Sequence, residues 1–165
     1  MVCDVLEICR YEPQCKYKNC SECRKVKAVS NVKCAEKRSK YILHNPNKMS
    51  IIEFHVDGGL IYDEENCPKC DYLYDINTPS GSAAVFVELK GKHYRDALRQ
   101  IENSIRLFKA AFRGAKLYAR IVCSNVPNIK NNPQDIKLEK AIKKHGVQLR
   151  DDKKEMTESV QSLLV

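Results

Sequence analysis

The segment from residue 83 to residue 124 constrains the fold of this chain more than any other. "AAVFVELKG" at 83–91 is an apolar run of strand-forming residues, followed by "AKLYARIVCS" at 115–124, a second strand. Between them, apolar side chains recur at steps of three and four, which predicts an amphipathic helix over 92–112. These side chains are Ala97, Leu98, Ile101, Ile105, Phe108 and Phe112. The pattern predicts two neighbouring strands joined by a right-handed helical crossover.

The remaining elements predict an α/β fold with a mixed β-sheet flanked by helices. The basic segment 21–41 is expected to be helical, and "MSIIEFHV" at 49–56 is expected to form a strand. Asp57-Gly58-Gly59 would turn that strand into a hairpin with "LIY" at 60–62. Further predictions are a strand at 70–76, a loop at 77–81, a helix at 134–145 and a strand at 146–151. We expect a cysteine-rich segment with a helix over 1–40 and a core over 41–165, forming one compact domain.

Charge and hydropathy limit the classes of protein to which the chain can belong. The 165 residues carry a formal net charge of +8, which suits a polyanionic partner such as nucleic acid, although a solvated basic surface gives the same excess. No apolar run reaches the roughly 20 residues that a membrane span requires. The N-terminal "MVCDVLEICR" lacks the pattern of a signal peptide. The sequence therefore predicts a cytoplasmic protein that does not contact membranes.

Two charged residues interrupt the apolar strand at 83–91. Because side chains alternate along a strand, Glu88 and Lys90 share one face. Val85, Val87 and Leu89 share the other face, which is expected to pack against the helices. A carboxylate and an ammonium group therefore lie side by side near the end of the strand.

A hairpin folded about Pro79 and Ser80 sets Asp71 directly opposite Glu88, with side chains roughly 5 Å apart at their base. Two carboxylates so placed repel each other unless a cation lies between them. Mg²⁺ is commonly held by one or two carboxylates together with substrate phosphates. Lys90 would then act on a water molecule or on charge developing at a phosphate. The alternative is a surface ion pair between Lys90 and one of the carboxylates.

Asp71, followed by "ELK" at 88–90 after an apolar strand, resembles the PD-(D/E)XK nuclease superfamily, which has a restriction-endonuclease-like core. The resemblance covers residues 50–124 and implies that Asp71, Glu88 and Lys90 are catalytic. It also implies that Mg²⁺ or Mn²⁺ is held by Asp71, Glu88 and the backbone carbonyl of Leu89. Gln100 is an accessory candidate from the following helix, although residue 104 is Ser where related nucleases carry Tyr. Glu36 is an accessory candidate from the first core helix.

The resulting hypothesis is a metal-dependent nuclease that hydrolyses phosphodiester bonds, with DNA favoured over RNA as substrate. Such a compact chain has little room for a separate sequence-reading domain. It would act as a homodimer, with a partner protein, or by recognising nucleic-acid structure. The alternative is a non-catalytic nucleic-acid-binding module stabilised by cysteine-bound metal.

The chain has nine cysteines, and because the sequence predicts no export signal, we do not expect a disulfide framework. Two CxxC pairs could together form a tetrahedral Zn²⁺ site; they comprise Cys20, Cys23, Cys67 and Cys70. A site formed among the N-terminal cysteines is an equal alternative, drawn from Cys9, Cys15, Cys20, Cys23 and Cys34. Buried free thiols are the other alternative. His55 and His93 are further candidates for metal or acid–base chemistry, although a histidine placed like His93 is more often a polar residue at the start of a helix.

Overall fold

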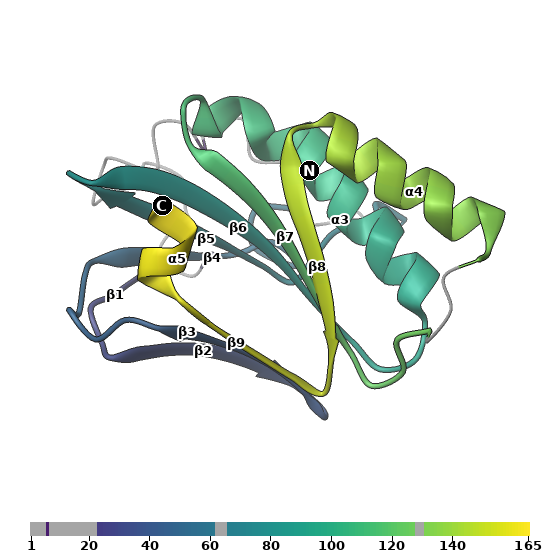
Figure 1. Cartoon of the computed structure of the whole chain (residues 1–165), viewed down its shortest axis with the longest axis horizontal. Coiled ribbons are helices and arrows are strands. Elements are labelled where there is room, and N and C mark those ends of the chain that lie inside the picture. The colour runs from purple at the N-terminus through teal and green to yellow at the C-terminus, as the bar shows by residue number, and fades with distance from the viewer. Residues whose placement is uncertain (1–5, 7–22, 62–65, 128–130) are drawn as a thin grey trace.

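The computed structural model describes Leu6 and residues 23–61, 66–127 and 131–165. Its elements form three layers, with two helices above a six-stranded sheet and a three-stranded sheet below it (Figure 1). The large sheet has the strand order β1-β4-β5-β6-β7-β8; its strands are β1 Arg24–Lys27, β4 Ile51–His55, β5 Tyr72–Thr78, β6 Gly81–Lys90, β7 Lys116–Cys123 and β8 Val147–Lys153. The small sheet has the order β2-β3-β9, with β2 Asn31–Glu36, β3 Ser39–His44 and β9 Glu155–Ser159. The predicted α/β class with sheet and flanking helices is confirmed.

The predicted crossover lies at the centre of the large sheet. β6 and β7 pair in parallel, and the helix α3 Tyr94–Phe108 connects them, continued by the 3₁₀ turn η1 Lys109–Phe112. Gly114 has a φ of 82°, a conformation that suits glycine, and ends this helical segment as the sequence indicates. The helix α4 Pro133–Lys144 then leads to β8, which pairs in parallel with β7.

Two apolar cores lie on opposite faces of the large sheet. Phe86 packs with residues of α3, including Leu98 and Ile101, in the core beneath the helices. Val85 and Val87 lie in the other core, between the two sheets. The prediction that the face of Val85 and Val87 packs against the helices is therefore wrong, because a second sheet covers that face. The charged residues of β6 are on the helix side.

The helix predicted over 21–41 is also wrong, since the described part of this segment forms strands β1, β2 and β3. Val32 and Cys34 are buried at alternate positions of β2, and their neighbours on either side are exposed. Tyr41 and Leu43 repeat this period of two in β3. Lys25, Lys33 and Lys40 occupy exposed positions of these strands, so a composition that is also typical of a solvated helix misled the prediction.

The domain boundary proposed at residue 40 lies inside β3. This strand pairs in parallel with β9, near the C-terminal end, so the small sheet unites both ends of the described chain. β9 and the short helix α5 Val160–Leu164 had no counterpart in the sequence prediction.

The hairpin predicted around Asp57 is wrong in its second arm. β4 pairs with β1 and β5, while Leu60 and Ile61 turn back and are buried in the core beneath the helices. Among the described residues of this segment, Asp57 and Ile61 form an isolated bridge of parallel type, which is not the pairing of a hairpin, and Tyr62 of the predicted arm lies outside the described residues. In the described part of the chain, no helix combines the length and apolar character needed to cross a membrane.

Candidate active site

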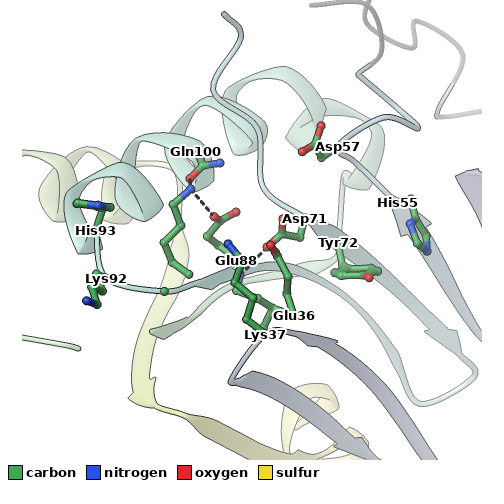
Figure 2. Close-up of a pocket in the computed structure, with 13 residues that line it drawn as sticks. Glu36, Lys37, His55, Asp57, Asp71, Tyr72, Glu88, Lys92, His93 and Gln100 are labelled. Carbon is green, nitrogen blue, oxygen red and sulfur yellow. Dashed lines mark hydrogen bonds and ion pairs between the residues drawn. The ribbon is translucent and has the colours of Figure 1, made fainter. Parts of the chain in front are cut away.

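A pocket of about 650 Å³ lies at the C-terminal end of β6, beside the residues that lead into β5. β5 and β6 form a hairpin with Tyr72 opposite Val87, a register that sets Asp71 opposite Glu88 as predicted. Both carboxylates line the pocket and come from adjacent backbones (Figure 2). The backbone N–H of Leu89 donates to Oδ2 of Asp71 at 2.7 Å, which fixes the orientation of that carboxylate.

Glu88 is a buried carboxylate that lacks a full set of partners. It is 1% exposed, and its Oε2 has no hydrogen-bond partner among the described residues. Burial, and after it the charge of Asp71, raise the pKa of Glu88 from 4.5 to about 9, against the opposing effect of Lys90. Burial likewise raises the pKa of Asp71 to about 6, against the effect of the Leu89 N–H. A buried polar atom without a partner costs free energy, so the pair favours either a proton or a cation.

Lys90 reaches the same pocket from the last position of β6. Its Nζ lies 3.6 Å from Oε1 of Glu88 and donates to Oε1 of Gln100 at 2.7 Å. Gln100, on α3, in turn donates through Nε2 to the carbonyl of Lys69 at 2.9 Å. The amide of Gln100 therefore has both ends occupied and holds the lysine ammonium beside Glu88.

The segment before Asp71 is attached to α3 at successive residues. Asn103 donates to the carbonyl of Pro68 at 2.6 Å, next to the bond from Gln100 to Lys69. The N–H of Cys70 then donates to Oγ of Ser104 at 2.9 Å. Ser104 is buried and occupies the position noted above as departing from the related nucleases. These three helix residues fix the backbone that delivers Asp71 to the pocket.

The described cysteines among those predicted to bind zinc do not belong to a group of side chains that could hold a metal ion. No group of three or more His, Cys, Asp or Glu side chains in the described part of the chain is arranged to hold a metal ion. Cys23, Cys34 and Cys70 are buried and Cys67 is half-buried. Cys9, Cys15 and Cys20 lie outside the described residues. Burial raises the pKa of Cys70 well above its usual value. Zn²⁺ binding by these cysteines stays a prediction.

The β2–β3 hairpin brings a third carboxylate to the pocket. Glu36, at the end of β2, and Lys37, in the turn, both line the pocket (Figure 2). The charge of Glu36 contributes to the raised pKa values of both Asp71 and Glu88. Glu36 thus reaches the predicted location from a strand and not from the predicted helix. The hydroxyl of Ser39 donates to the carbonyl of Lys90 at 3.1 Å, which ties the hairpin to β6.

The rim of the pocket holds an ammonium group, two imidazoles and a phenol. Lys92 and His93 lie on one side, at the start of α3, and both are exposed. Tyr72 and His55 lie on the other side (Figure 2). Sequence reasoning missed Lys37 because it assigned the segment to a helix, and missed Tyr72 because alternation placed it on the face away from Asp71.

No protein-family model, curated protein or solved structure matches this chain. Its candidate chemistry therefore depends on the residues of the pocket themselves.

Proposed function

We propose that the protein is a metal-dependent nuclease that hydrolyses phosphodiester bonds of nucleic acid, with DNA favoured as substrate. The observation that carries the proposal is the buried Oε2 of Glu88, which has no hydrogen-bond partner in the described part of the chain, on a residue that lines the same pocket as Asp71. A carboxylate of purely structural function would be expected to be fully hydrogen-bonded when buried. Glu88 lines a pocket of about 650 Å³, which has room for a cation and a phosphate.

The order of the elements supports this proposal through the resemblance to the PD-(D/E)XK superfamily. β4, β5 and β6 form an antiparallel meander, and β7 follows after α3 in parallel with β6. The resemblance expects an acidic residue at the start of the middle strand and Glu-x-Lys at the end of the next strand. Asp71 immediately precedes β5, while Glu88 and Lys90 end β6.

The donor set fits Mg²⁺ or Mn²⁺ better than it fits zinc. Asp71 and Glu88 supply two carboxylates and Leu89 a backbone carbonyl, with Glu36 as a further acid. Hard cations bind through oxygen, and Mg²⁺ often takes only one or two carboxylates while water and phosphate complete its shell. When bound, such an ion lowers the pKa of water and stabilises charge on a phosphoryl group.

The protein's own residues position and assist the reactants. The Lys90 ammonium, held by Gln100, is suited to orient the attacking water and to offset charge on the scissile phosphate. In hydrolysis, the water oxygen forms a bond to phosphorus and the bond to the leaving oxygen breaks. Lys37 and Lys92, both exposed at the rim, are suited to contact neighbouring phosphates.

The direct test is incubation of the purified protein with plasmid, linear duplex, single-stranded DNA and RNA. We expect cleavage with Mg²⁺ or Mn²⁺ and none with EDTA. A preparation of Lys90→Ala made in parallel controls for contaminating nuclease. Intact substrates with every metal, together with metal-independent binding, would instead support a non-catalytic nucleic-acid-binding module.

A further inference from the structure

Tyr72 and His55 form an aromatic pair on the wall of the pocket that the proposed hydrolysis does not use. Tyr72 directly follows Asp71, and His55 lies opposite Tyr72 in the pairing of β4 with β5. Their ring centroids are 4.8 Å apart with an interplanar angle of 68°, an edge-to-face arrangement. Both side chains line the pocket, and neither is fully buried.

Contacts with residues outside the pocket lining hold both rings in place. Tyr74 stacks near Tyr72, with ring centroids 6.4 Å apart and an interplanar angle of 11°. The hydroxyl of Tyr74 donates to Oε2 of the buried Glu53 at 3.0 Å. Nε2 of His55 lies 3.7 Å from Oε1 of the same carboxylate. The buried Glu53 therefore holds His55 directly and Tyr72 through Tyr74, so the two rings need little rearrangement to accept a flat ligand.

We infer that the Tyr72–His55 pair is a stacking platform for a nucleobase next to the scissile phosphate, and that the substrate is single-stranded nucleic acid. This inference rests on the proposed nuclease function for the identity of its ligand. Every nucleobase has a flat π-face, so an aromatic platform binds single strands with little sequence preference.

The position of the platform relative to the carboxylates supports this substrate class. Tyr72 directly follows Asp71 in the chain, and although the two side chains leave the backbone on opposite faces, both line the same pocket (Figure 2). A base at Tyr72 would therefore belong to a nucleotide close to the reacting phosphate. In a duplex that base is stacked and paired, and it must be extruded before it can reach a side chain. A single strand presents it without that cost.

The rim charges agree with a strand that crosses the pocket. Lys37 lies on the hairpin side and Lys92 near the start of α3, and both are exposed. Basic side chains that follow the backbone, combined with aromatic stacking of bases, are the usual means of binding single strands.

Binding can test the platform without any cleavage. In EDTA and at fixed salt, fluorescence anisotropy would compare a labelled single-stranded DNA with the same sequence closed into a hairpin duplex. We expect the single strand to bind at least about fivefold tighter. Tyr72→Leu and His55→Ala should each weaken single-strand binding about tenfold, within the range of about 5- to 150-fold for one stacked base, and leave duplex binding unchanged.

Two matched variants separate stacking from general damage. Tyr72→Phe keeps the ring and should bind as the parent does. His44→Ala removes an exposed histidine at the end of β3, outside the pocket lining, and should also have no effect. An RNA arm with the same sequence shows whether the platform accepts both sugars. Circular dichroism and urea midpoints confirm that each variant is folded.

Equal affinity for single strand and duplex, or equal losses on both in Tyr72→Leu and His55→Ala, would overturn the platform. Because the assay contains no divalent cation, its result does not depend on cleavage. If single strand and duplex bind equally but the protein cleaves nucleic acid in a metal-dependent way, the platform is refuted and the nuclease proposal stands. A selective loss beside absent cleavage would remove the nuclease proposal and leave a single-strand-binding site.

Discussion

Glu88 and Glu158 are both buried acids, yet the structure treats them in opposite ways. Glu158, in β9, accepts from Nε and Nη2 of Arg120 at 2.7 and 3.0 Å and from the Tyr41 hydroxyl at 2.6 Å. The side chains of Arg120 and Glu158 are 6% and 8% exposed. Glu88 has only Lys90 at 3.6 Å, and its Oε2 has no hydrogen-bond partner among the described residues.

This difference separates a structural acid from a candidate functional one. Glu158 joins the small sheet to β7, and its bidentate pair with Arg120 compensates the cost of burying both charges. Glu88 has no such compensation, and its pKa of about 9 means that it binds a proton at neutral pH when no cation is present. The nuclease proposal requires a buried carboxylate whose oxygens are not all hydrogen-bonded, because such a carboxylate can bind an added cation strongly.

The largest expected effect is on catalysis at the unsaturated site. Lys90→Ala should reduce cleavage by about 10²- to 10⁴-fold and leave nucleic-acid binding largely intact, because the ammonium acts on water and developing charge. Glu88→Gln should reduce cleavage at least as much and also abolish the stabilisation that Mg²⁺ gives the parent, because the carboxylate is the proposed metal ligand. Single-turnover rates and thermal melts with and without Mg²⁺ measure both.

Lys33→Ala, at an exposed position of β2 outside the pocket lining, is the matched control and should cleave at the parental rate. Parental cleavage in Lys90→Ala would mean that Lys90 is only a surface charge.

The next effect is on stability at the saturated pair. Arg120→Met should lower the free energy of unfolding by about 3–5 kcal/mol, because it leaves the Glu158 charge buried without its partner. Lys90→Met should change it by no more than about 1 kcal/mol, because Lys90 is partly exposed and Glu88 can hold a proton. Urea unfolding followed by circular dichroism measures both variants.

The double variant Arg120→Met/Glu158→Leu should recover most of the loss, since no unpaired charge then remains. Equal destabilisation by Arg120→Met and Lys90→Met would erase the distinction between the two acids.

The pH dependence of stability should distinguish the acids further. The pKa of Glu88 is raised from 4.5 to about 9 on folding, so between these values the folded state binds more protons than the unfolded state. Without metal, stability should therefore fall as pH rises through this window, by up to about 4 kcal/mol between pH 5 and pH 8. Urea midpoints in EDTA at both pH values measure the loss.

Glu88→Gln should flatten this dependence and be slightly more stable than the parent at pH 8, because the amide is uncharged at every pH and folding then requires no proton uptake at this position. Mg²⁺ at about 100 times its Kd should return about 2.7 kcal/mol to the parent and little to the variant. A parent whose stability rises from pH 5 to pH 8 in EDTA would contradict the raised pKa of Glu88.

The smallest expected effect concerns the residue that holds Lys90. Gln100→Leu should lower the cleavage rate about tenfold, because it frees the Lys90 ammonium from its position while keeping the size of the side chain. The dependence of the cleavage rate on pH should change as well, because the Gln100 amide is a direct hydrogen-bond partner of Lys90. Gln134→Leu, at an exposed position of α4, is the matched control. An unchanged rate and profile in Gln100→Leu would show that Lys90 is positioned by Glu88 alone.

The register of the β5–β6 hairpin could be predicted from the sequence because it depends on local geometry. Thr78 pairs with Gly81 around Pro79 and Ser80, so a symmetric two-residue turn determines every pair up to the pocket. The α3 crossover was predictable for the same reason, since its apolar period is strong and Gly114 ends it. The positions of Glu36 at the end of a strand and of Lys37 in the following turn were not predictable, because their lysine-rich surroundings suit an exposed helix as well as an exposed hairpin.

The sequence by itself determined the hairpin, the crossover and the facing positions of Asp71 and Glu88, all of which follow from the period of side chains along neighbouring segments. Only the tertiary structure decided which layer covers each face of β6, because a strand's alternation separates two faces without naming their partners. It also decided that the β2–β3 hairpin and the Tyr72–His55 pair reach the pocket. These contacts join residues far apart in the chain, and the packing of the three layers, which no local pattern encodes, brings them together.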